Sequence, residues 1–212
     1  MLKLYSTDWS PWVRKVRISA IERNIEEYIE IITANIGFAE KTLKTVESEL
    51  TKFNPSGRVP TLITEEGQSV YDSTVIVHYL DSIGKADPII SKNIEKKITS
   101  LRINALVDEI IDSLRHLSFE NRREKNIRLP HWIEALDKKV RRGIDIIETD
   151  FVHLSKPEVN ILDLADISTI ILLGSIRRNP NSPYNIFSDN LNTWYNDMEE
   201  RKSVMQTTPP KL

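Results

Sequence analysis

The stretch NPSGRVPTLITEEGQSVYDSTVIVHYLD, residues 54–81, constrains the fold more than any other part of the chain. Its first four residues, Asn-Pro-Ser-Gly, predict a turn. Residues 61–64 and 68–71 then have the composition of two short strands joined by a glycine-containing turn, which is typical of a β-hairpin. Apolar residues then recur three or four positions apart, which predicts a helix. Asp72 or Ser73 can cap this helix. These apolar residues are Val75, Ile76, Tyr79, Leu80 and Ile83.

Two features of this stretch suit a ligand that resembles an amino acid or a short peptide. Pro60 lacks a backbone donor and is tolerated at the first residue of a strand; a cis bond before it would turn the N–H and C=O of Val59 outward. The start of the helix near Ser73 offers unpaired N–H groups to a carboxylate, and Asp72 offers an anion to an ammonium group. Taken singly, these features also fit a trans proline and an ordinary helix cap.

The residues before this stretch predict alternating strands and helices. Leu2–Ser6 forms an apolar-rich strand, and Ser10 followed by Pro11 is a favoured start for a helix. Residues 27–33 predict a second strand, and residues 39–53 predict a charged amphipathic helix. The resulting order is that of a thioredoxin-like α/β domain, in which a right-handed crossover makes the first two strands parallel.

The remainder of the chain predicts helices only. Residues 84–93, which contain Asp87-Pro88, have the composition of a linker. Helices are expected at about 94–117, 130–154, 163–176 and 188–200. Asp163 stands three residues before Asp166, a pattern similar to a capping box that we expect to serve folding. We therefore expect a thioredoxin-like domain at 1–83, a linker at 84–93 and an all-helical domain at 94–212.

Composition excludes several classes of function. A net charge of −2 with mixed signs does not favour nucleic acid or a membrane surface as a partner. The chain has no cysteine, so thiol chemistry would have to use the sulfur of a ligand. Its four histidines show no metal-ligand spacing. Without a secretory leader or a membrane-spanning run, we expect a cytoplasmic protein.

The segments NPSGRVPTL and VYDSTVIVHYLD resemble the glutathione-site signature of the glutathione transferase superfamily. SPWVRKVRI at 10–18 and HWIEALDKKVRRGIDIIE at 131–148 extend the resemblance over most of the chain, and the chain is similar to bacterial cytosolic members of serine type. The resemblance implies a glutathione-binding thioredoxin-like N-terminal domain followed by an all-helical C-terminal domain.

The resemblance also implies roles for individual residues. Val59 and Pro60 would hold the cysteinyl backbone of glutathione, Asp72 and Ser73 its γ-glutamyl end, and Arg58 its glycine carboxylate. Arg58 also fits an exposed turn residue.

Ser10 corresponds to the catalytic hydroxyl of serine-type members, which stabilises the glutathione thiolate. A plain N-cap is its alternative role, and Tyr5, Ser6 and Thr7 are alternative donors in the same loop. Trp9 and Trp12 would line an apolar pocket for the electrophile, or would bridge the two domains.

The implied activity is conjugation of glutathione, the co-substrate, to a small apolar electrophile, as in detoxification. The resemblance also implies a homodimer, and no metal is expected. One alternative is a transferase fold kept as a binding module, as in the stringent-starvation proteins that act on transcription. Another is a glutathione-dependent reductase or peroxidase.

Overall fold

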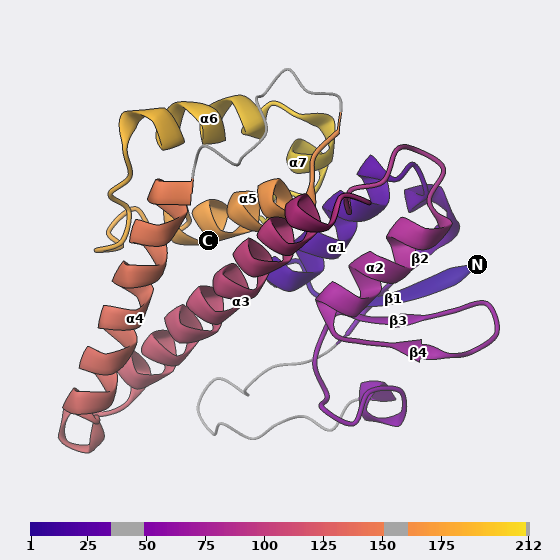
Figure 1. Ribbon diagram of the computed structural model, residues 1–212. Helices are drawn as coiled ribbons and strands as arrows, with labels where there is room; N and C mark the ends of the chain where they lie inside the picture. Colours follow the sequence, from indigo (N-terminus) through magenta and orange to yellow (C-terminus); the bar gives the residue numbers. More distant parts are fainter. Residues whose placement is uncertain (35–48, 151–160, 211–212) are drawn as a thin grey trace. The chain divides into compact units, whose positions relative to one another are not determined.

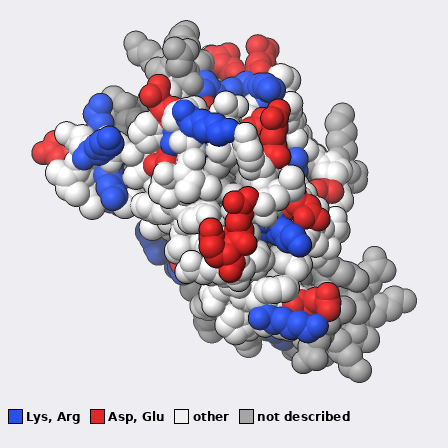
Figure 2. All heavy atoms as spheres, turned by 90° about the vertical axis from the view of Figure 1, so that its right-hand side faces the viewer, with Lys and Arg blue, Asp and Glu red and all other residues white. Residues whose placement is uncertain are grey.

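The computed structural model describes residues 1–34, 49–150 and 161–210, which divide between two compact units. One unit takes Met1–Ile90 and the segment from Lys202 onward, and the other takes Ser91–Arg201. In the described ranges no helix is both long and apolar enough to cross a membrane. On the face drawn in Figure 2, basic and acidic side chains are interspersed among uncharged ones.

The first unit contains a four-stranded mixed sheet with the order β2-β1-β3-β4. Its strands are β1 (Leu2–Ser6), β2 (Ile29–Thr33), β3 (Thr61–Ile63) and β4 (Ser69–Val70). β2 pairs parallel with β1, whereas β3 pairs antiparallel with both β1 and β4. The predicted thioredoxin-like pattern is confirmed. The second strand begins two residues later than predicted, because Glu26–Tyr28 forms a 3-10 turn.

Helices α1 (Pro11–Glu22) and α2 (Ser73–Ile83) pack against each other in this unit (Figure 1). Both begin where the sequence predicts. Of the apolar residues that predict α2, two are not buried, since Val75 is 50% exposed and Ile83 is 44% exposed. The buried side chains of α2 are those of Ser73, Ile76, Val77 and Leu80. Of the predicted helix 39–53, residues 39–48 lie outside the described ranges, and Glu49–Lys52 forms a 3-10 turn.

A short C-terminal helix that the sequence did not predict, α7 (Lys202–Gln206), belongs to the same unit and contacts α1. Arg14 of α1 donates from Nη2 to the carbonyl oxygen of Val204 at 3.3 Å. Ser203 donates from Oγ to Glu22 Oε1 at 2.5 Å. Val204 is fully buried, so α7 covers one side of α1 by both apolar burial and hydrogen bonds.

The second unit is helical, as predicted, and its described residues contain no strand. Helices α3 (Ile94–Arg122) and α4 (Pro130–Thr149) lie side by side as a long antiparallel pair (Figure 1). α5 (Leu164–Arg177) packs on α3, and nearly every one of its side chains is buried. A helix that is buried on all sides forms the centre of such a unit. α6 (Asp189–Glu199) completes it.

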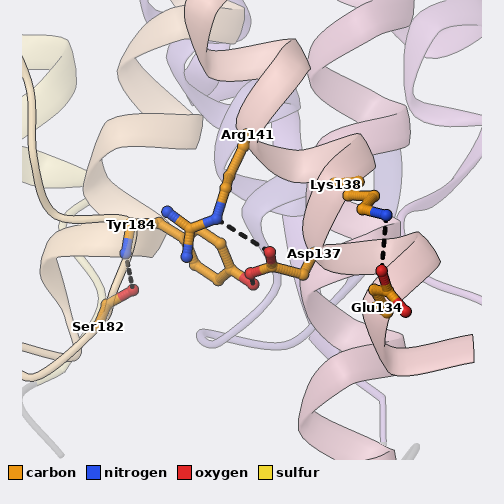
Figure 3. Close-up of polar contacts among 6 residues, drawn as sticks. All are labelled: Glu134, Asp137, Lys138, Arg141, Ser182 and Tyr184. Atoms are coloured by element: carbon orange, nitrogen blue, oxygen red, sulfur yellow. Dashed lines mark hydrogen bonds and ion pairs between the residues drawn. The ribbon is translucent and has the colours of Figure 1, made fainter. Parts of the chain in front are cut away.

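On the surface of α4, two basic side chains pair with acidic side chains one turn earlier in the same helix. Lys138 contacts Glu134 at 2.6 Å, and Arg141 contacts Asp137 at 2.9 Å (Figure 3). Tyr184, from the loop before α6, donates its hydroxyl to Asp137 Oδ1 at 2.7 Å. Burial and this carboxylate raise the pKa of the Tyr184 hydroxyl. The carboxylate of Asp137 therefore ties the loop to α4.

The predicted capping box at the start of α5 is confirmed. Asp163 Oδ1 accepts from the N–H of Ala165 at 2.7 Å and of Asp166 at 3.0 Å. In return, Asp166 Oδ2 accepts from the N–H of Asp163 at 2.8 Å. Ser100 of α3 also accepts from the Ala165 N–H at 2.9 Å, which links the cap to the neighbouring helix.

Replacement of Asp163 tests the contribution of this cap to stability. Asp163→Ala removes the accepting oxygen and should lower the free energy of unfolding by about 1 kcal/mol, the usual cost of a lost N-cap. Asp163→Asn keeps an accepting oxygen and should cost much less. Urea unfolding of the two variants measures the difference, and equal losses would contradict the assignment.

A comparison of wild type with Asp163→Asn tests the ionisation of Asp163. Burial raises the pKa of its carboxyl above the ordinary 3.8, so the folded protein binds this proton more tightly than the unfolded chain. The resulting contribution to stability is present at low pH and is lost as the pH rises from 3.8 through the folded-state pKa. The stability of wild type minus that of Asp163→Asn should therefore fall across this window. A constant difference would contradict the raised pKa.

Candidate functional site

Strand register brings three segments of the predicted site to one edge of the sheet. Tyr5 of β1 lies opposite Thr61 of β3, and Leu62 of β3 lies opposite Val70 of β4. Because β3 runs antiparallel to both neighbours, the chain leaves β1 and β4 at the edge where it enters β3. The loop toward Ser10, the residues before Thr61 and the residues after Val70 therefore share that edge.

Val59 and Pro60 enter β3 through a cis peptide bond. The Val59 side chain is buried in a cluster with Val13 of α1, Ala34 and Leu50. Among the described residues, neither the N–H nor the C=O of Val59 has a hydrogen-bond partner. Its side chain is therefore anchored, while both of its backbone polar groups remain available to a ligand.

Asn54 organises the turn before Val59, a role that the sequence analysis did not assign. Its buried amide donates from Nδ2 to the carbonyl oxygen of Arg58 at 3.1 Å and to Thr61 Oγ1 at 2.9 Å. Its Oδ1 accepts from the N–H of Ser56 at 3.0 Å. The Asn-Pro pair predicted a turn, but only the fold shows that the amide bridges both sides of Val59.

Asp72 and Ser73 form the start of α2. Asp72 is exposed, and its Oδ1 accepts from the N–H of Thr74 at 3.0 Å and of Val75 at 3.3 Å. Within the described ranges, Oδ2 of Asp72 and the N–H of Ser73 have no hydrogen-bond partner. The cap therefore leaves one carboxylate oxygen for a cation and one helix N–H for an anion.

Lys15 reaches the same place from α1, and sequence analysis did not identify it. Its side chain is fully buried, and Nζ donates to Ser73 Oγ at 3.4 Å. A lysine in the middle of an amphipathic helix gives no sequence signal of burial, because lysine is almost always exposed.

Ser10 is half-buried and caps α1: its Oγ accepts from the N–H of Val13 at 3.3 Å. This cap uses a lone pair and leaves the hydroxyl proton free to donate, so capping and thiolate stabilisation are compatible. Val13 also contacts Val59, which joins the Ser10 end of α1 to the segment before β3.

The other predicted site residues differ in exposure. Trp9 is 48% exposed, Trp12 is half-buried and Arg58 is exposed. Among the alternative donors, Ser6 is buried, Thr7 is half-buried, and the Tyr5 ring packs 5.5 Å from that of Phe53. The described residues contain no cluster of side chains suited to a metal ion.

The mixed sheet with its helical second unit matches the architecture of solved glutathione transferases. Residues 9–83 match the family "Glutathione S-transferase, N-terminal domain". The chain is 26% identical to the uncharacterized GST-like protein YibF of Escherichia coli, with 99% of this chain and all of that protein covered. The chain is therefore similar to glutathione S-transferases over nearly its whole length.

Two solved structures show the same fold over 99% of this chain and all of theirs. One is a glutathione transferase family member from Pseudomonas fluorescens with bound glutathione, at 26% identity and a TM-score of 0.86. The other is a glutathione S-transferase from Methylobacillus flagellatus with bound glutathione, at 28% identity and a TM-score of 0.81.

Asn54→Ala tests whether the amide organises the turn before Val59. It removes buried hydrogen bonds and should lower the free energy of unfolding by about 1–3 kcal/mol, with shifted amide NMR signals at residues 55–61. The control, Asn93→Ala, removes the Oδ1 that caps α3 by accepting from Glu95 and Lys96. It should also destabilise, by about 1 kcal/mol, but leave those signals in place. Unmoved signals in Asn54→Ala would refute this role.

Proposed function

We propose that the protein is a serine-type glutathione transferase, which transfers the thiolate of glutathione to an electrophilic carbon of a small apolar molecule. The observation that carries the proposal is the backbone of Val59, whose N–H and C=O lack partners among the described residues while its side chain is buried. Such a fixed backbone edge can pair with the cysteinyl residue of glutathione as a strand does. The glutathione found in two solved relatives supports the same ligand.

The charged ends of glutathione fit the groups that flank this edge. The α-carboxylate of the γ-glutamyl residue would accept from the N–H and hydroxyl of Ser73 at the positive end of α2. Its α-ammonium group would donate to Asp72 Oδ2, the carboxylate oxygen that the helix cap does not use. Arg58, which is exposed beside the edge, would pair with the glycine carboxylate.

Ser10 would act on the sulfur. Its hydroxyl donates to the thiolate while its Oγ continues to accept from Val13, so the donor is held in place before the ligand arrives. A free thiol has a pKa near 8.5, and lowering it by one unit requires about 1.4 kcal/mol. One hydrogen bond to a charged group, together with the dipole of α1, supplies this stabilisation.

The proposal also covers the parts of the chain around this site. Met1–Ile90 with the segment from Lys202 onward would form the glutathione-binding domain, and Ser91–Arg201 the helical domain. Trp9 and Trp12 would line the apolar pocket for the electrophile. The protein acts as a cytoplasmic homodimer in detoxification, as the family resemblance implies.

Binding to glutathione tests the first part of the proposal. The protein should be retained on immobilised glutathione, be eluted by free glutathione, and show a rise in melting temperature at millimolar ligand. Failure in both assays would favour the binding-module alternative. Activity with a hydroperoxide or a disulfide, but not with an aryl halide, would favour the reductase or peroxidase alternative.

Substitution of Ser10 tests the second part. Ser10→Gly removes the hydroxyl but costs the helix cap only a few tenths of a kcal/mol. We expect conjugation of an aryl halide to slow about 10- to 100-fold, the value of one hydrogen bond to a charged group, with glutathione affinity nearly unchanged. Ser10→Thr retains both the hydroxyl and the cap and should keep most of the activity. Unchanged turnover in Ser10→Gly would assign the donor to another residue of the loop.

A further inference from the structure

The contact between Lys15 and Ser73 has a chemical consequence for the hydroxyl of Ser73. An ammonium group only donates hydrogen bonds, so at 3.4 Å from Lys15 Nζ the oxygen of Ser73 acts as an acceptor. The proton of the hydroxyl must then point elsewhere. Within the described part of the chain, no acceptor for that proton is found.

The burial of both side chains keeps this arrangement in place. Ser73 is 3% exposed and Lys15 is fully buried, so water competes little for the contact. The charge of a buried cation is also screened less by salt than a surface charge. The ammonium of Lys15 therefore stands close behind the start of α2, where the free N–H of Ser73 already favours an anion.

We propose that Lys15 is a positioning residue that makes the Ser73 hydroxyl a dedicated donor to a ligand carboxylate and thereby selects ligands with an anion at the start of α2. This inference rests on the proposed function, in which that anion is the α-carboxylate of the γ-glutamyl residue. Lys15 acts through Ser73 and does not touch the reacting sulfur. Its effect falls on ligand binding and not on the chemical step.

Two analogues of glutathione separate this role from a general contribution to folding. Glutaryl-Cys-Gly keeps the carboxylate but lacks the α-ammonium group, and 4-aminobutanoyl-Cys-Gly keeps the ammonium group but lacks the carboxylate. Lys15→Met should weaken binding of glutathione and of glutaryl-Cys-Gly about tenfold, the effect of one lost hydrogen bond in a polar site. It should leave the weaker binding of 4-aminobutanoyl-Cys-Gly unchanged in calorimetric titration.

Three further variants complete the test. Lys15→Gln retains a donor without the charge and should fall between wild type and Lys15→Met. Lys15→Met combined with Ser73→Ala should bind glutathione no more weakly than Ser73→Ala alone, since Lys15 acts through that hydroxyl. Arg17→Met removes a cation from the same helix and should leave the preference between the two analogues as in wild type.

The kinetics should show the same division. With an aryl halide as electrophile, Lys15→Met should raise the KM for glutathione about tenfold and leave kcat unchanged, because the lost interaction is equal in ground and transition states. If Lys15→Met does not fold, Lys15→Gln provides the same comparison, since its amide remains polar at the buried site.

The outcomes separate the inference from the function on which it rests. If wild type does not bind glutathione, the proposed function fails and the role of Lys15 fails with it. If wild type binds glutathione but both analogues weaken equally in Lys15→Met and Lys15→Gln, Lys15 is structural and only the inference is overturned. The same holds if neither substitution changes binding of any of the three ligands.

Discussion

The antiparallel pairing of β3 with both β1 and β4 is the constraint on which the site depends. It turns three chain segments toward one edge of the sheet, although they are separated by tens of residues in sequence. Burial fixes the pairing, because Leu4 and Leu62 lie opposite each other and both are fully buried. A slip of one residue would turn these side chains to the other face of the sheet. The positions of Val59 and Asp72 therefore follow from the packing of leucines.

Helix α1 connects the segments that this edge brings together. Its first turn carries the cap Ser10, Val13 packs beside Val59, and Lys15 reaches Ser73. Both α2 and α7 contact this one helix, so more than one of its faces is buried. Arg14 is therefore also buried, with Nη2 bound to a carbonyl oxygen of α7. A shift of α1 would move the proposed thiolate donor and the proposed carboxylate site together.

Much of this arrangement follows from the sequence, because local patterns encode it. The turn at residues 54–57, the caps at Ser10 and Asp163, and the helix start at Asp72 are each set by residues within a few positions. The helical second unit follows from apolar periodicity in the same way. The strands are predicted to within two residues, where local turns such as Glu26–Tyr28 compete with pairing.

The features that escaped sequence analysis depend on contacts between distant segments. Lys15 and Ser73 are 58 residues apart, and Arg14 and Val204 are 190 apart. In sequence, Lys15 and Arg14 belong to the polar side of an amphipathic helix. That side is buried only because α2 and α7 pack against it. Helical spacing of apolar residues likewise does not show which of them are buried, since the fold exposes Val75 and Ile83.

At the two helix starts of the candidate site, the groups that cap the helices can also serve the proposed ligand without conflict. A helix cap needs one acceptor per N–H, and both Ser10 and Asp72 have more capacity than the cap consumes. At Ser10 the cap uses a lone pair of Oγ and leaves the hydroxyl proton available. At Asp72 the cap uses Oδ1 and leaves Oδ2 available. Ser73 completes the set, because Lys15 occupies its oxygen and leaves its proton. A helix start built in this way is folded without a ligand, so the groups proposed to contact glutathione are ordered before it binds.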